Sequence, residues 1–181
     1  MRILGLAGSL RRDSVNRGLI RSAQELAPDG VTVEGFDLRA LPFFDADVEA
    51  IGDPRPVEAL KDAIRGADAL LIATPEYNHG VPGVLKNAID WASRPKAAAA
   101  LAAKPVAIMG AGGVGATAFA QSQLFEHLAA AGAEVIEPSV QIARAWEHFD
   151  GHGNVIDPDV RVEVGLLVDA LVRKVAATVR V

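Results

Sequence analysis

Polar residues that could bind an anion are concentrated in one short stretch near the start of the chain. An apolar run, Ile3-Leu4-Gly5-Leu6-Ala7, leads into Gly8-Ser9-Leu10-Arg11-Arg12-Asp13-Ser14-Val15-Asn16, where a helical pattern begins. The free N–H groups and the positive dipole end of a helix N-terminus bind anions. Ser9, Ser14 and Asn16 would add hydroxyl and amide donors. We predict that this loop binds a phosphate group.

The spacing of the residues in this loop indicates which kind of phosphate compound it would bind. The loop lacks the Gly-Lys-Ser/Thr ending of nucleoside-triphosphate loops, and Gly8 lacks the glycine partners of a dinucleotide fingerprint. One glycine with many hydroxyl donors, together with the charges of Arg11, Arg12 and Arg17, fits a phosphate monoester. The alternative is an ordinary strand–turn–helix unit with Ser14 as helix N-cap and solvated arginines.

Composition limits the class of protein. The chain has 181 residues, which predicts one domain over residues 1–181. It has no cysteine, which excludes disulfides and thiolate chemistry, and its net charge of −5 argues against a nucleic-acid partner. We see no apolar run of about 20 residues and no leader pattern. We therefore expect a cytoplasmic protein with no membrane partner.

Strand and helix patterns alternate along the whole chain. Apolar runs predict strands over 2–7, 31–36, 68–74, 104–109 and 133–136. Helical spacing predicts helices over 15–27, 56–65, 82–93, 117–131 and from Pro158 to the C-terminus. This order predicts an α/β fold, a flavodoxin-like three-layer sandwich with a five-stranded parallel sheet in the order 2-1-3-4-5.

Two stretches have no clear pattern. Residues 37–56 form a long segment rich in Pro, Asp and Gly, and such segments are usually functional or carry short local structure. Phe43 and Phe44 in this segment would either cap the core or act at an interface or lid. We predict that residues 140–157 are irregular.

The predicted topology selects the loops that form a binding site. In an open α/β sheet, ligands bind beyond the carboxyl ends of the strands, at the point where the strand order reverses. That rule selects residues 8–16, 75–80 and 110–115. The backbone N–H groups of Pro75-Glu76-Tyr77-Asn78 would face a planar heterocycle, which Tyr77 would stack on or support from below. The alternative is a simple turn with Asn78 as helix N-cap, and we expect Glu76 to form a salt bridge rather than act as a base.

The third loop spells a Gly-x-Gly-x-x-Gly pattern through Gly110, Gly112 and Gly115. On its own this pattern is a weak indication of dinucleotide binding. The next acidic residue, Glu137, lies 27 residues after Gly110 (137 − 110), whereas the fingerprint expects roughly 20. We interpret the loop as a tight turn whose backbone approaches one edge of a ring.

The histidines offer little evidence of catalysis. His148, Asp150 and His152 alternate and could be imagined as metal ligands, but no fourth ligand frames them, so we predict a polar turn and no metal. His79, in the second loop, would either meet a substrate or be solvated. We predict no catalytic side chain.

Two of these loops carry a family resemblance. Gly8-Ser9-Leu10-Arg11 with Ser14 and Asn16 resembles the Gly-Ser-x-Arg-x-x-Ser-x-Asn motif of the NADPH-dependent FMN reductase family. Pro75-Glu76-Tyr77-Asn78, followed by residues 81–91, is similar to the second motif of that family, and the resemblance covers nearly the whole chain.

The resemblance implies a cofactor, a reaction and a site. It implies non-covalent FMN, reduced by NADPH or NADH in a ping-pong cycle that passes the electrons to a quinone, a dye or a metal oxyanion. The residues expected to bind FMN are Ser9, Arg11, Ser14, Val15, Asn16, Pro75, Glu76, Tyr77, Asn78, Ala111, Gly112 and Gly113. It also implies a homodimer or homotetramer, with residues 82–91 as a candidate contact surface.

Three alternatives remain open at this point. A flavodoxin-like electron carrier would bind FMN without oxidising pyridine nucleotides. A regulatory flavoprotein would bind FMN and turn over slowly. A dinucleotide-binding protein would take NAD(P) through residues 110–115 and would purify colourless.

Overall fold

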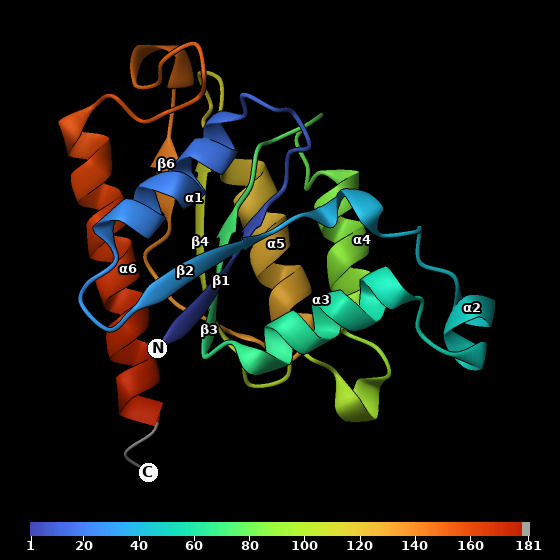
Figure 1. Cartoon of the computed structure of the whole chain (residues 1–181). Helices are drawn as coiled ribbons and strands as arrows, with labels where there is room; N and C mark the ends of the chain where they lie inside the picture. Colours follow the sequence, from blue (N-terminus) through green and yellow to red (C-terminus); the bar gives the residue numbers. More distant parts are fainter. Residues whose placement is uncertain (179–181) are drawn as a thin grey trace.

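A parallel β-sheet forms the centre of the protein, seen in a computed structural model that describes residues 1–178 (Figure 1). Its strands are β1 (Arg2–Ala7), β2 (Thr32–Phe36), β3 (Ala69–Ala73), β4 (Pro105–Ala111), β5 (Glu134–Val135) and β6 (Val140–Ile142). The strand order is β2-β1-β3-β4-β5, which confirms the predicted flavodoxin-like order.

The sheet has one strand more than predicted. β6 lies in the segment predicted to be irregular and pairs in parallel with Met109, Gly110 and Ala111 of β4. This pairing also extends β4 two residues past the end predicted at 109. A three-residue strand is too short to be recognised from the sequence, because the alternation of apolar and polar residues needs at least about four residues to be distinguished.

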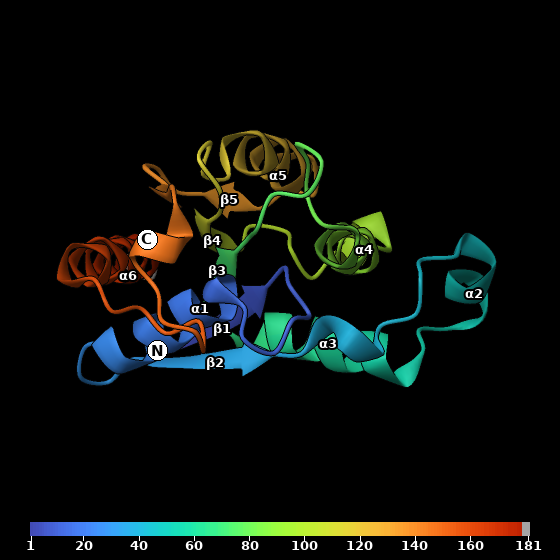
Figure 2. The same ribbon diagram turned by 90° about the horizontal axis from the view of Figure 1, so that it is seen from above.

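Helices cover both faces of the sheet. They are α1 (Val15–Leu26), α2 (Ala46–Ile51), α3 (Arg55–Gly66), α4 (Gly83–Ala92), α5 (Ala118–Ala130) and α6 (Pro158–Thr178). Figure 2 shows α1 and α6 on one side of the sheet and α3, α4 and α5 on the other. Successive strand residues face opposite sides, so Leu71 packs in the α1–α6 layer and Leu70 in the other layer. The three-layer arrangement follows from this alternation.

Residues 37–56 form a projecting segment with short local structure. It contains a 3₁₀ turn, η1 (Leu38–Ala40), and then α2, which stands away from the rest of the molecule (Figure 1). The Phe44 ring packs edge-on against Trp91 with ring centroids 4.9 Å apart, whereas Phe43 is 85% exposed. The two phenylalanines therefore differ: Phe44 contacts the body and Phe43 faces solvent.

The last helix, α6, follows the predicted periodicity from Pro158, and Val164, Val168 and Leu171 are buried along it. The prediction that it continues to the C-terminus includes residues 179–181, which lie outside the described residues. Among residues 1–178, none of the helices combines the length and apolar character needed to cross a bilayer.

Candidate functional site

The three loops selected from the sequence meet at the carboxyl ends of β1, β3 and β4. Backbone hydrogen bonds carry the sheet pairing past the strand ends, from Gly8 N to Ala73 O (2.8 Å) and from Thr74 N to Met109 O (2.9 Å). Between the loops lies a cavity of about 620 Å³. Its lining residues are Ser9, Arg11, Ser14, Val15, Asn16, Pro75, Glu76, Tyr77, Ala111, Gly112, Gly113, Ala145, Trp146, Phe149 and Asp150.

The first loop brings buried polar groups to this cavity. Ser9, Ser14 and Asn16 are each at most 5% exposed. Ser14 stands at the N-cap of α1, yet its side chain makes no capping hydrogen bond, and the first turn of α1 has no acidic residue. The hydroxyl group and the helix N-terminus are thus available to an anion in the cavity.

Asn16 joins the first loop to the third. Its Nδ2 donates to Ala111 O (2.9 Å), and its Oδ1 accepts from Ala111 N (3.0 Å). A carboxamide carries two N–H donors, so one Nδ2 hydrogen remains for another acceptor. Asn16 therefore fixes the distance between α1 and the end of β4.

Tyr77 joins the second loop to the first. Its hydroxyl donates to Ser9 Oγ (3.3 Å), while its backbone exchanges hydrogen bonds with Gly80. Between them, Asn78 and His79 adopt left-handed backbone angles, with φ of 50° and 59°. Asn78 is the one predicted residue that does not line the cavity, and it is not a helix cap, because α4 begins after Pro82.

Glu76 is held by structural contacts. Its Oε2 accepts from the backbone N of Ala120 (3.0 Å), in the first turn of α5. Its Oε1 lies 3.3 Å from His79 Nδ1. A carboxylate bound at both oxygens is poorly placed to act as a base, as the sequence interpretation expected.

Close packing explains why glycine stands at positions 110 and 112 of the third loop. A methyl carbon added at Gly110 would lie 2.3 Å from Thr117 Oγ1 and 2.4 Å from Thr74 O. One added at Gly112 would lie 2.3 Å from Ala116 O. Gly110 and Gly112 therefore let the loop pack on itself and on the residue after β3, whereas nothing lies within 4 Å of a methyl carbon at Gly115. This role differs from that of the pattern in dinucleotide folds.

The fourth wall of the cavity was not predicted from the sequence, and it is built by Ala145, Trp146, Phe149 and Asp150. These residues follow β6, and Ala145 N donates to Gly112 O (2.9 Å). The signal that the sequence offered for this wall was the presence of Trp146 and Phe149 close together, in a chain where aromatic residues make up 5%.

The polar turn at residues 150–154 holds no metal site. Asp150 Oδ1 accepts from the backbone N of His152 (2.9 Å) and of Asn154 (2.8 Å), and the bonds from Asn154 lower the pKa of Asp150. His148 Nδ1 instead bonds to Asp157 Oδ2 at 2.6 Å. Over residues 1–178, no group of three His, Cys, Asp or Glu residues could hold a metal ion.

The model of the NADPH-dependent FMN reductase family matches residues 1–147. The chain belongs to this family.

Relatives within the NADPH-dependent FMN reductase family cover nearly the whole chain. An NAD(P)H-dependent FMN reductase of Pseudomonas aeruginosa is 43% identical over 163 residues, covering 89% of this chain and 88% of that protein. A 2-hydroxy-1,4-benzoquinone reductase of Burkholderia sp. is 39% identical and covers 99% and 97%. The solved structure of FerB, a flavoenzyme NAD(P)H:(acceptor) oxidoreductase from Paracoccus denitrificans, matches with a TM-score of 0.85 at 34% identity, covering 97% of each chain.

Proposed function

We propose that this protein is an FMN-dependent oxidoreductase that transfers electrons from NAD(P)H to a quinone-like acceptor in a ping-pong cycle. One observation carries the proposal: the three loops predicted to bind FMN line one cavity at the switch point of the sheet. Relatives named as FMN reductase and benzoquinone reductase support the same activity.

The first loop has the donors that an FMN phosphate needs. Ser9 and Ser14 would donate their hydroxyls, the start of α1 would donate backbone N–H groups, and Arg11 would add charge at the cavity wall. Asn16 would add its remaining Nδ2 hydrogen. The chemistry of this donor set fits a phosphate monoester.

The second and third loops would hold the isoalloxazine ring. Pro75, Glu76 and Tyr77 would border one part of it, and Ala111 to Gly113 another, with Asn78 beside them by motif. When bound, FMN accepts a hydride from the nicotinamide and delivers two electrons to the acceptor. Backbone N–H groups from these loops would stabilise negative charge on the reduced ring. No acid or base from the chain is required.

Flavin binding to an Arg11→Ala variant tests the proposal. Loss of one charge-assisted hydrogen bond, worth roughly 1.5–3 kcal/mol, should weaken FMN binding about 10-fold to 100-fold, measured by fluorescence titration of the apoprotein. Arg173→Ala, which removes an exposed arginine of α6, is the matched control. Equal flavin affinity in both variants would show that the phosphate assignment is wrong.

Anaerobic addition of NADPH separates the enzyme from the other flavoproteins. Bleaching of the flavin absorbance, followed by reoxidation on addition of a benzoquinone, supports the oxidoreductase. A flavin band that persists would favour an electron carrier or a regulatory flavoprotein.

The resemblance also motivates a proposal about assembly, that the protein is a homodimer or homotetramer. The exposed apolar side chains of Phe43 and Ile51 on the projecting segment support it. Light scattering on the purified protein tests it, and a monomer at micromolar concentration would contradict it.

A further inference from the structure

A second hollow borders the first loop on its other side. It has a volume of about 430 Å³, within the usual range for small-molecule sites. Its lining residues are Gly5, Ala7, Arg12, Arg17, Ile20, Arg21, Gln24, Gly35, Phe36 and Asp37. None of these residues lines the proposed FMN cavity, although Arg12 directly follows Arg11 in the chain.

The floor of this hollow is formed by the edge of the sheet and by Ile20 of α1. Gly5 of β1 and Gly35 of β2 are partners in the strand register. A methyl carbon added at Gly35 would meet nothing within 4 Å, and one added at Gly5 would lie 2.8 Å from Ile20 Cγ2. Open sheet surface therefore remains at Gly35, where a planar group would fit, whereas the Ile20 side chain covers Gly5.

The wall of the hollow is positively charged. Arg17, Arg21 and Gln24 follow one another at helical spacing on α1, so they share one face of the helix, and Arg12 joins them from the loop. Arg21 donates to Asn154 Oδ1 at 2.8 Å and to two backbone carbonyls, all of which are neutral acceptors.

These arginines lack carboxylate partners. Among the ion pairs formed within residues 1–178, none includes Arg12, Arg17 or Arg21. Asp37 is the one acidic residue in the lining, and it pairs with Arg39 at 3.1 Å. Three guanidinium groups without a counter-charge, in a chain of net charge −5, form a site for an anion.

We propose that this hollow is a second phosphate site, and that it binds the phosphomonoester of an adenine nucleotide. Guanidinium forks match phosphate oxygens in bidentate geometry, and the open sheet surface at Gly35 would accept the purine. The source would be either the 2′-phosphate end of NADPH or a free nucleotide. The NADPH source rests on the proposed function, since it names the substrate that this function would prefer.

The test uses the FMN-loaded protein, in which the flavin site is already filled. An Arg12→Gln/Arg17→Gln double variant removes two arginines that form no ion pair within residues 1–178. It keeps Arg21, which donates hydrogen bonds to the turn at residues 152–154. Arg173→Gln on α6 is the matched charge control. The readouts are the ratio of kcat/KM for NADPH to that for NADH, and calorimetric binding of adenosine 2′-monophosphate at fixed ionic strength.

We expect the kcat/KM ratio to fall at least tenfold in the double variant and to stay constant in the control, together with loss of adenosine 2′-monophosphate binding. Lost nucleotide binding with an unchanged ratio would support the site and assign it to a free nucleotide. Unchanged values of both readouts would overturn the proposal and leave the oxidoreductase function standing.

Two further results separate this proposal from the proposed function. Release of FMN from the double variant would overturn the second site, because it would assign these arginines to the flavin phosphate. If the native protein oxidised neither NADPH nor NADH, the proposed function would fail, and calorimetry alone would still decide whether the hollow binds a nucleotide.

Discussion

The first loop, residues 8–16, and the projecting segment, residues 37–56, are both long connections that leave the carboxyl end of a strand, yet they are built differently. The loop buries its polar residues Ser9, Ser14 and Asn16 against neighbouring loops. The segment buries no residue of α2, and Ile51 on that helix is 89% exposed. The first loop forms one wall of a cavity, whereas the projecting segment stands away from the body and is held by a few polar contacts.

The contacts where the segment leaves the body come from α4. Asn87 Nδ2 and Trp91 Nε1 both donate to Pro42 O at 2.9 Å, and Asn87 Oδ1 accepts from Phe44 N at 2.7 Å. These bonds satisfy the backbone of the segment where it leaves the body.

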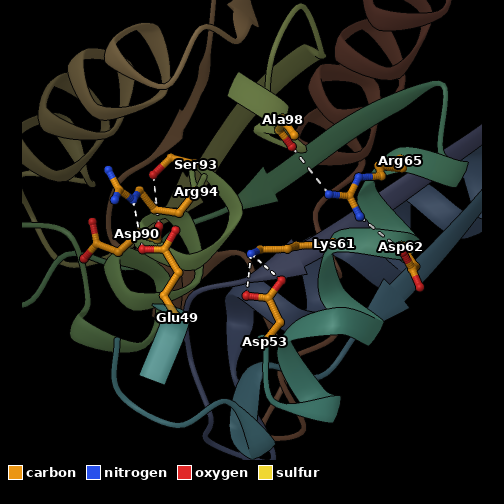
Figure 3. Close-up of polar contacts among 9 residues, drawn as sticks. All are labelled: Glu49, Asp53, Lys61, Asp62, Arg65, Asp90, Ser93, Arg94 and Ala98. Carbon is orange, nitrogen blue, oxygen red and sulfur yellow. Dashed lines mark hydrogen bonds and ion pairs between the residues drawn. The ribbon is translucent and has the colours of Figure 1, made fainter. Parts of the chain in front are cut away.

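Two ion pairs fix the far end of the segment, as Figure 3 shows. Arg94 Nε lies 3.2 Å from Glu49 Oε2. Lys61 is 1% exposed, with its Nζ at 2.6 Å from Asp53 Oδ2 and 5.9 Å from the Trp91 ring centroid. Polar bonds therefore stabilise both regions. Their placement decides whether a connection forms the wall of a cavity or projects into solvent.

The largest effect on stability should come from adding a methyl group at Gly110, where the third loop is tightly packed. Gly110→Ala should cost about 3 kcal/mol in the free energy of unfolding, because its methyl group would overlap the backbone oxygen of Thr74, the residue that follows β3. Gly113→Ala, where nothing lies within 4 Å, should change stability little. Urea denaturation measures both, and equal stability of the two variants would contradict this account of the third loop.

The ion pair between Asp53 and Lys61 should give the next effect. Asp53→Ala should cost roughly 2–3 kcal/mol, because it leaves the buried ammonium of Lys61 without its partner. An Asp53→Ala/Lys61→Met double variant should recover more than half of that loss by thermal denaturation. A double variant less stable than the single one would show that the pair does not act as a unit.

The link between the first and third loops should be worth slightly less. Asn16→Ala should cost about 2 kcal/mol, because the N–H and C=O of Ala111 lose their buried partner. Its affinity for FMN should fall as well. Gln24→Ala, which loses a single bond to Val33 O at the edge of α1, is the control. If Asn16→Ala kept its stability and its flavin affinity, Asn16 would have no role in positioning the walls of the cavity.

The turn at residues 150–154 should respond to acid. Its hydrogen bonds lower the pKa of Asp150 from the ordinary value of 3.8. A carboxyl group with a lowered pKa in the folded state contributes stability above its unfolded pKa and loses it as the pH falls through the folded pKa. Below pH 3.8, the Tm of the native protein should therefore fall towards that of Asp150→Asn. Parallel Tm curves for the two proteins between pH 5 and about 2 would contradict this role.

The smallest effect is expected at the tip of the projecting segment. In the monomer, Ile51→Ser should change the unfolding free energy by less than about 0.5 kcal/mol, because the side chain lies in solvent there. FMN affinity, measured in parallel, should not change. A larger loss of stability would show that the tip is covered in solution.

The sequence by itself determined the strand order and the loops of the site. The buried runs of β3 and β4 and the helical spacing of α1 and α6 are local patterns, and the switch-point rule turns their order into a location. These features could be predicted because each depends on neighbouring residues. Ser9, Tyr77 and Gly112 were placed at the cavity on that ground.

Only the tertiary structure decided which side chains meet across the fold. Asn16 and Ala111 are 95 residues apart in the chain, and they pair because β1 and β4 lie on either side of β3. β6 was too short to be recognised alone, so Trp146 remained unplaced until its strand joined β4. The sequence grouped Arg11 with Arg12 as one source of charge, whereas in the fold Arg11 lines the proposed FMN cavity and Arg12 lines the second hollow, because the path of the loop in space, which the sequence does not reveal, sets where each side chain lies.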